Sequence, residues 1–358
     1  MATTPVNLAV TNVLSTSVRL TWEDALQALI AAIFGANEQG AFYLPRPIVN
    51  GAQALFQDSA GTVAVTADGD PDGLMIDQSP NSINAVQTIS SRRPTYNTSP
   101  DRLSLDKVDD GLIITVPAGG WTGTMVLATD DGTASYGISI PAGAYSLGGQ
   151  LFPGEAIVGA LFRDGALTAA KKTDVESYFV GNGATASYGG VTSFSNYWSR
   201  NNEITEFPLI DTSSGTSFSN TWRECQSLLS FPLINTSSAA SFNFTWFRCS
   251  SLTSFPLIDT SSCSSFRESW FQCYLLTDFP SNAFDNIKGG QFSSAFGQTN
   301  LNETSIDGIL VSLVTSGIAA GTRLFDQSGG SAPSVGTGQP AIDTLRSRGW
   351  TVTVTGGY

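Results

Sequence analysis

The chain has 358 residues and a formal net charge of −13 at pH 7, with only 13% of its residues charged and 36 glycines. This length suffices for two or three domains that each bury a core, and the composition favours a mainly β protein. We expect no nucleic-acid partner, because the charge is negative and the 17 Lys and Arg residues are scattered along the chain. There is no histidine, the commonest general base and metal ligand, so we expect neither an enzyme nor a metal or cofactor site.

Residues 1–40 are predicted to be an N-terminal attachment segment. Their start, PVNLAVTNVLSTSVRLTWE, resembles the first two strands of a fibronectin type III module, with Trp22 as its core tryptophan. The chain then leaves that module, because DALQALIAAIF places five apolar side chains on one helical face: Leu26, Leu29, Ile30, Ile33 and Phe34. The start lacks the basic and apolar regions of a secretion signal, and no stretch reaches the roughly 20 apolar residues of a membrane span, so we expect no membrane insertion.

Residues 41–185 are predicted to form a β-sandwich, because short apolar or alternating runs are separated by Gly, Pro and Asp turns. The run LFQDSAGTVAVTADGDPDGLMIDQSPNSINAVQTISSRRPTYNT resembles a segment frequent in tail and other structural proteins of bacteriophages and prophages. In those proteins the segment leads into a concanavalin-like sandwich, so the resemblance implies the same fold here. LSLDKVDDGL stands where that family has an FDGVDD turn, and Lys107 marks the departure from it.

Residues 186–300 contain an internal repeat with a period of about 24 residues, within the range typical of solenoids. Three aromatic columns recur at this period: Phe194, Phe218, Phe242 and Phe266; Trp198, Trp222, Trp246 and Trp270; and Phe207, Phe231, Phe255 and Phe279, each followed by proline. One coil cannot offset its own ordering entropy by burying about five large apolar side chains, so the coils are expected to stack as a solenoid. A looser copy with Phe292 and Phe296, slightly longer than the others, is expected to be the last coil.

Within a coil, the sequence predicts a short strand, an inward thiol and a polar turn. The strand is expected to contain Leu228, Phe231 and Leu233 and their counterparts, among them Leu257. Cysteine recurs once per repeat at Cys225, Cys249 and Cys273, with Asn201 in the first such place, which favours buried, reduced thiols over a disulfide framework. The unit F-x-x-x-W-x-x-C-x-x-L-x-x-F-P-L-I-[DN]-T-S-S resembles the BspA-like leucine-rich repeats of bacterial surface proteins.

Residues 301–358 are predicted to be a helical and β C-terminal cap. SIDGILVSLVTSG has apolar residues at helical spacing, with Ser305 placed to cap the start of the helix and Gly317 to end it. A second helix is expected after Pro340 and should stop at Gly349, before a strand in WTVTVTG. This ending resembles the closing segment of phage and bacterial repeat proteins of the same type.

Three groups of residues invite a sharper functional interpretation. Asp68, Asp70, Asp72 and Gly73 imitate the start of a calcium loop, but position twelve is Ser79 instead of glutamate, which favours an acidic turn. The carboxylates of Glu203, Glu206, Asp211 and Glu224 could in principle include a glycosidase pair, but lack recurring partners and are expected to be solvated surface groups. The regularly repeated tryptophans are expected in the core, not on an exposed sugar-stacking surface.

The residues that vary between the inward columns are predicted to form one mildly acidic, hydroxyl-rich ligand-binding face. They are Glu203, Thr205, Glu206, Ser227, Leu229, Ser230, Ser251, Thr253, Ser254, Leu275, Thr277 and Asp278. Such a face suits hydrogen bonding to a carbohydrate or to another virion protein, and the alternative is a solvated face without a ligand.

The resemblances together imply a structural virion protein of a bacteriophage or prophage, exposed on the particle as a tail fibre, receptor-binding or decoration component. Its expected location is the virion surface, after synthesis in the host cytoplasm. Its expected partners are other virion proteins, through the N-terminal segment, and a host surface glycan or protein, with a homo-oligomer, preferably a trimer, as the assembly. The alternatives are a bacterial cell-surface adhesin with leucine-rich repeats and a polysaccharide-degrading tail fibre.

Overall fold

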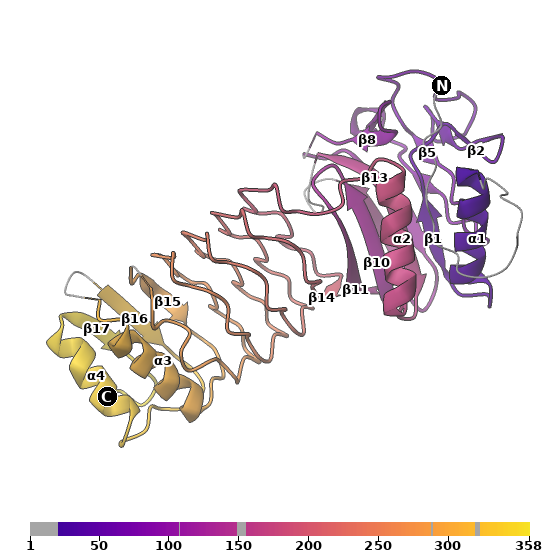
Figure 1. The fold of residues 1–358 in the computed structure, drawn as a ribbon. Coiled ribbons are helices and arrows are strands. Elements are labelled where there is room, and N and C mark those ends of the chain that lie inside the picture. Colours follow the sequence, from indigo (N-terminus) through magenta and orange to yellow (C-terminus); the bar gives the residue numbers. More distant parts are fainter. Residues whose placement is uncertain (1–20, 107, 149–154, 288, 319–322) are drawn as a thin grey trace, which may run out of the picture. The chain divides into compact units, whose positions relative to one another are not determined.

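The computed structural model describes residues 21–106, 108–148, 155–287, 289–318 and 323–358 (Figure 1). Most of the predicted fibronectin-like run precedes Thr21 and, like Lys107, lies outside the described residues. Its last residues, Trp22 and Glu23, begin a helix instead of ending a strand, and Trp22 is only half-buried. The chain divides into two compact units, Met1–Tyr188 (unit 1) and Gly189–Tyr358 (unit 2). Strands and bridges predominate over helices, as expected of a mainly β protein. None of the helices in the described part of the chain has the length and apolar character needed to cross a membrane.

Unit 1 is built on two antiparallel sheets. The larger has the order β11-β10-β13-β8-β7, with β1 also paired to β13; its strands are β1 (Gly40–Tyr43), β7 (Thr95–Asn97), β8 (Arg102–Ser104), β10 (Trp121–Thr129), β11 (Thr133–Ile140) and β13 (Ala156–Asp164). The smaller has the order β12-β9-β6-β5-β4, with strands β4 (Leu55–Phe56), β5 (Leu74–Met75), β6 (Ala85–Val86), β9 (Gly111–Val116) and β12 (Gly143–Gly148). A short hairpin, β2 (Ile48–Val49) with β3 (Ala52–Gln53), and a 3-10 turn, η1 (Ser90–Arg92), complete the unit.

Aromatic side chains from both sheets meet in one core. The ring of Phe162 on β13 lies 6.0 Å from Trp121 on β10 and 5.9 Å from Tyr145 on β12 of the other sheet. The larger sheet is covered on its second face as well, which explains why MVLA and AIVGALF read as nearly continuous apolar runs.

Two helices provide that second cover. Helix α1 (Trp22–Phe34) starts at a capping box made by Thr21 and Asp24, and it buries the face predicted from its apolar spacing. Helix α2 (Ala169–Gly181), which the sequence analysis did not predict, packs on β10 and β11 (Figure 1). A side chain at Gly159 would collide with the ring of Phe179, because a Cβ atom there would lie 2.3 Å from it. Both helices therefore share one hydrophobic core with the sheet.

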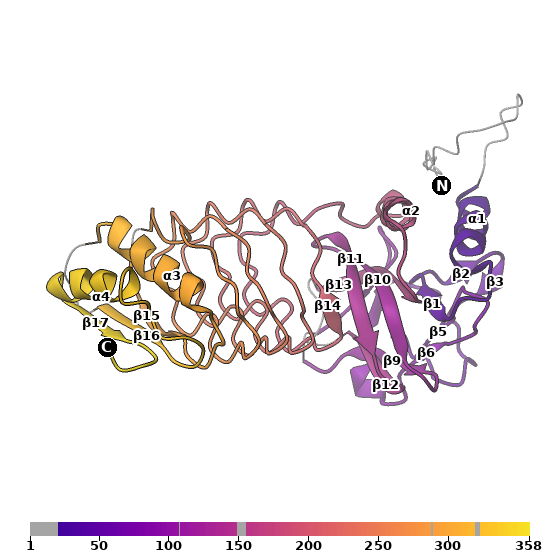
Figure 2. The ribbon, with the colours of Figure 1, turned by 90° about the horizontal axis from the view of Figure 1, so that it is seen from below.

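In unit 2 the coils stack at the period of the sequence repeat (Figure 2). Parallel bridges join Ser193 to Ser217, Ser217 to Ser241 and Ser241 to Ser265, each spanning one repeat. The next bridge joins Ser265 to Gln291 instead of position 289, which confirms that the last copy is slightly longer. Backbone N–H groups donate from each coil to the next in the same pattern, so the hydrogen bonds of one coil depend on its neighbour.

The aromatic columns form ladders of rings inside this stack. Trp246 lies 5.7 Å from Trp222 and 5.3 Å from Trp270, and both neighbouring rings are nearly parallel to it. The edges of Phe231 and Phe255 meet the same indole at 5.3 and 4.7 Å. All four repeat tryptophans are buried, as predicted.

The predicted strand within the coil is wrong in its second half. Leu233 and Leu257 are 61% and 45% exposed, whereas the isoleucines that follow them are buried. The reason is a turn: the N–H group of Ile234 donates to the carbonyl of Pro232 at 3.0 Å. In the next coil Ile258 donates to Pro256 at the same distance. The extended part shrinks to β14 (Ile204–Glu206) in the first coil and to single bridges, Glu206 to Ser230 and Ser254 to Asp278.

The C-terminal residues continue the stack and close it. β15 (Phe292–Phe296), β16 (Arg323–Gln327) and β17 (Trp350–Thr353) form a parallel sheet, accompanied by α3 (Glu303–Thr315) and α4 (Gly338–Ser347). Ser305 is not the cap predicted for α3, because the side chain of Asn302 accepts the first-turn N–H bond at 2.8 Å. The Ser305 hydroxyl instead accepts the N–H group of Phe279 at 2.9 Å, and Ser312 accepts that of Phe284 at 2.8 Å. The helix thus satisfies donors of the coil that contains Trp270.

The second predicted helix also begins earlier than expected. α4 starts at Gly338, before Pro340, because proline fits the first turn of a helix, where no N–H donor is required. Its end agrees with the prediction, since Gly349 follows the helix with a left-handed φ of 85°.

We predict that Trp246→Ala destabilises unit 2 by about 3 to 5 kcal/mol, because it removes a fully buried ring that two neighbouring coils contact. Leu233→Ala, at an exposed position of the preceding coil, should change stability by less than about 0.5 kcal/mol. Urea unfolding followed by circular dichroism measures both. Equal, small losses for the two variants would contradict the core assignment of the tryptophan ladder.

Candidate functional site

The residues of the predicted ligand-binding face align in columns from coil to coil. The backbone of one column is linked by N–H bonds from Leu229 to Thr205 at 2.9 Å and from Thr277 to Thr253 at 2.9 Å. The next column outward contains the bridges of Glu206 with Ser230 and of Ser254 with Asp278. The structure therefore brings these side chains side by side, as the repeat spacing requires.

The columns of this face differ in exposure. Glu206, Ser230, Ser254 and Asp278 are exposed, whereas Glu203, Ser227 and Ser251 are half-buried. Burial raises the pKa of Glu203 above its ordinary value, which makes this carboxyl the least available of the predicted acidic groups. Leu229 and Leu275, each 52% exposed, add apolar surface between the hydroxyls. The face therefore offers hydroxyl and carboxylate groups along its outer edge, with apolar side chains beside them.

The last coil of the face is partly engaged in holding the cap. The Thr277 hydroxyl donates to the carboxylate of Asp278 at 2.7 Å, and the amide of Asn302 donates to the same carboxylate at 2.9 Å. The exposed hydroxyls of Thr253 and Ser254, in the coil before, are better placed to meet a ligand.

Two of the carboxylates considered for catalysis have structural partners. Asp211 accepts the N–H group of Ser213 at 3.0 Å. Hydrogen bonds from the side chain and the backbone of Ser213 hold the pKa of Asp211 below its ordinary value. Asn235 and Asp259 make the same bond in the next two coils, which identifies this position as a turn cap. Glu224 pairs with Arg200 at 3.3 Å and with Arg223 at 3.2 Å.

The aspartates that imitate a calcium loop point to separate partners. Asp68 accepts the N–H group of Thr98 at 2.8 Å, and Asp70 accepts that of Thr66 at 2.8 Å. Asp72 is fully buried. The carboxylates of Asp68 and Asp70 therefore stabilise an acidic turn, the interpretation that the sequence favours.

Another acidic loop brings its carboxylates closer together. Of the acidic side chains in the described ranges, those of Asp106, Asp109 and Asp110 come within 4.8 Å of one another. Asp106 caps its own loop by accepting three N–H groups, and Asp109 pairs with Arg92 at 2.9 Å. Both carboxylates are thus accounted for by contacts within the fold.

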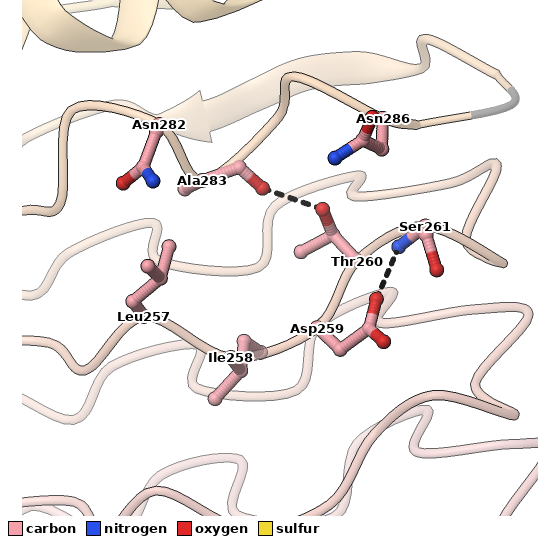
Figure 3. Close-up of a pocket in the computed structure, with 8 residues that line it drawn as sticks. All are labelled: Leu257, Ile258, Asp259, Thr260, Ser261, Asn282, Ala283 and Asn286. Atoms are coloured by element: carbon pink, nitrogen blue, oxygen red, sulfur yellow. Dashed lines mark hydrogen bonds between the residues drawn. The ribbon is translucent and has the colours of Figure 1, made fainter.

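A pocket of about 240 Å³ lies beside the cap and was not predicted from the sequence (Figure 3). It is lined on one side by residues 257–261 and on the other by Asn282, Ala283 and Asn286. The signal in the sequence is the departure of FPSNAF from FPLI[DN]T, which puts Ser281 where leucine recurs. Close packing explains this change, because a Cβ atom at Gly308 of α3 would lie 2.6 Å from Cβ of Ser281. The small side chain of Ser281 therefore leaves room for the helix to pack.

The repeated thiols face inward, as predicted. Each Sγ atom donates to the carbonyl of a tryptophan one coil earlier: Cys225 to Trp198 at 3.0 Å, Cys249 to Trp222 at 3.1 Å and Cys273 to Trp246 at 3.2 Å. All four cysteines are buried and free, and burial raises the pKa of Cys225 and Cys263 to about 12. A thiol in this state is a poor nucleophile.

We predict that thiol reagents label these four cysteines only when the stack opens. Because neither access nor thiolate is available in the folded protein, labelling at pH 8 should be at least a hundredfold slower than in urea, on the order expected for opening by about 3 kcal/mol or more. Mass spectrometry with and without denaturant measures it. Rapid labelling of the native protein at Cys249, the central thiol of the column, would disprove the inward placement.

Asp72 predicts a pH dependence of the stability of unit 1. Burial raises the pKa of this carboxyl from 3.8 to about 7, against the opposing effects of nearby N–H groups and the Arg93 charge. Between these two pKa values the folded state holds a proton that the unfolded chain has lost. The stability of unit 1 is therefore unaffected by the burial of this charge below pH 3.8, and it decreases as the pH rises to about 7.

Asp72→Asn should flatten the pH dependence, by up to about 4 kcal/mol between pH 4 and pH 7.5, because the amide does not ionise. Urea unfolding of both proteins at the two pH values measures the difference. An unchanged pH profile in the variant would show that the Asp72 carboxyl ionises as easily in the folded protein as in the unfolded chain.

Comparisons with known proteins add no functional assignment for these sites. The chain matches no protein-family model, no curated protein and no solved structure.

Proposed function

We propose that the chain is a structural protein of a bacteriophage or prophage virion, exposed on the particle as a tail fibre, receptor-binding or decoration component. The observation that carries this proposal is the regular stack in unit 2, which repeats the same outward positions in successive coils. A weak contact at one coil is thereby repeated along the stack, and again in each copy on a particle. The phage-like run within residues 55–98 connects this architecture to a virion.

The finer fold that accompanies this function is a concanavalin-like sandwich in unit 1 and a BspA-like leucine-rich-repeat solenoid in unit 2. The meeting of rings from both antiparallel sheets around Phe162 supports the sandwich. The parallel bridges at a constant offset and the buried Phe, Trp, Cys and Leu columns support the solenoid. The hydroxyls of Ser305 and Ser312 support a capping role for α3.

In this proposal the N-terminal segment attaches the chain to other virion proteins, and the subunits form a homo-oligomer, with a trimer preferred. The solenoid face of Glu206, Ser230, Thr253 and Ser254 then contacts a glycan or protein of the host surface. Its exposed hydroxyls support hydrogen bonding to such a ligand, and no catalytic step is required.

We predict that Thr253→Lys with Ser254→Lys reduces adsorption of assembled particles to host cells at least several-fold, because two long cationic side chains replace two exposed hydroxyls. Thr277 is left unchanged, since its hydroxyl holds the carboxylate of Asp278. The matched control is Ser237→Lys with Ala240→Lys, which adds the same charge at exposed turn positions.

Melting temperature and particle assembly should be unchanged for both double variants. Undiminished adsorption by the Thr253 and Ser254 variant would reject this face as the host-binding site. An equal loss in both double variants would assign the effect to added charge and also reject it.

A further inference from the structure

The arginines of the coils gather on one side of the stack. In residues 189–300, leaving out position 288, every Lys or Arg lies between the Phe column and the Cys column of its coil: Arg200, Arg223, Arg248 and Arg267. They belong to four successive coils, whose tryptophan rings lie 5.3–5.7 Å apart. A linear ligand running along the stack would therefore meet one guanidinium per coil.

Aromatic side chains lie among these arginines. The guanidinium of Arg223 lies 4.9 Å from the ring of Phe247 and 5.9 Å from that of Phe244, and Arg267 lies over Phe244 at 5.5 Å. Arg248 lies 5.4 Å from the Phe247 ring. Phe271 stacks on Phe247 at 5.6 Å. We call the six residues Arg223, Phe244, Phe247, Arg248, Arg267 and Phe271 the arginine–aromatic face.

The electrostatics of this segment differ from those of the whole chain. Between the Phe and Cys columns of the four coils there are four arginines and two glutamates, Glu224 and Glu268, a net charge of +2 in a chain of −13. The glutamates contact Arg223 and Arg267 through Nε, at 3.2 and 3.4 Å. A guanidinium held in this way can present its two terminal nitrogens to a carboxylate or phosphate.

Phe244 occupies a backbone position that suits another residue. Its φ is +57°, in the left-handed region, where a bulky side chain is disfavoured and asparagine is tolerated. The two preceding coils have Asn196 and Asn220 at the equivalent position, with φ of 65° and 59°. Folding alone would therefore favour asparagine at position 244. The left-handed conformation itself belongs to the repeat, since Glu268 shares it in the next coil, but the side chain placed there at position 244 is a phenylalanine that lies between two arginines.

We propose that the arginine–aromatic face binds an acidic polysaccharide. The guanidinium groups pair with carboxylates along the glycan, and the half-buried ring of Phe244 stacks on the apolar face of a sugar. A nucleic acid would also offer anions and flat rings, but the net charge of −13 opposes a long, densely charged phosphate backbone. The inference goes beyond the proposed function by adding a second face with its own ligand class, and its test does not need the particle.

The probe is polygalacturonate, a linear polyuronate, titrated into the full chain by calorimetry at low salt. Arg223→Gln with Arg267→Gln should weaken binding about tenfold or more, because two charge-assisted contacts are lost. Arg92→Gln is the matched control, since it removes an exposed, carboxylate-paired arginine from unit 1 and should leave binding unchanged. Binding should also weaken as salt is added.

Phe244→Asn separates a binding role from a structural one. The variant installs the residue of the two preceding coils, so its melting temperature should stay the same or rise while polyuronate binding falls several-fold. A lower melting temperature with unchanged binding would show that Phe244 serves the fold, and would overturn its proposed role.

The proposal fails if the wild-type chain binds polygalacturonate no better than neutral dextran, or if the double arginine variant binds as well as wild type. Tighter binding of an oligothymidylate than of the polyuronate would also overturn it, in favour of single-stranded nucleic acid. None of these outcomes depends on the Thr253 and Ser254 face, so particle adsorption tests the proposed function independently.

Discussion

Unit 2 depends on contacts between neighbouring coils, because no coil can bury its own aromatic side chains. The indole of Trp246 lies between the rings of Trp222 and Trp270, which belong to the two adjacent coils. The edge of Phe231, from the preceding coil, and the edge of Phe255, from the same coil, contact its flank. Many backbone N–H groups and the Sγ atoms of the repeated cysteines likewise find their acceptors in adjacent coils. A stack held in this way has unsatisfied ends, and the hydroxyls of Ser305 and Ser312 satisfy two donors at one of them.

The same constraint explains how one repeat can produce two chemically different surfaces. Since inward positions are fixed by ring and thiol contacts, outward positions of equal repeat phase must line up in columns. One set of columns contains the exposed hydroxyls of Ser230, Thr253 and Ser254. On another surface Arg223, Arg248 and Arg267, which occupy different positions of their coils, meet around the rings of Phe244 and Phe247. Each side chain contributes little alone, but a ligand that runs along the stack meets several similar groups at once, and affinity rises through multiple contacts.

The sequence predicted best what the period alone determines. Burial of the Trp and Cys columns, the greater length of the copy that reaches Gln291 and the apolar face of α1 all follow from spacing. The outward direction of Leu233 could not be predicted, because it depends on a turn closed by one backbone bond at Pro232. The arginine–aromatic face was missed for a related reason: Arg223 and Phe247 lie one full repeat apart, and they looked scattered until adjacent coils brought them together.

Phe244 shows how far such a stack separates folding from recognition. A bulky residue in the left-handed region costs on the order of 1 to 3 kcal/mol, and it persists only where the surrounding structure fixes the backbone. Here the backbone is fixed from both sides, since the N–H group of Phe244 donates to the carbonyl of Arg267 and that of Asn220 donates to Asn243. The hydrogen bonds between coils therefore keep the backbone in register although the side chain at this outward position is unfavourable. A scaffold with this property can change its surface one coil at a time, because the contacts between coils are made by inward side chains and by the backbone.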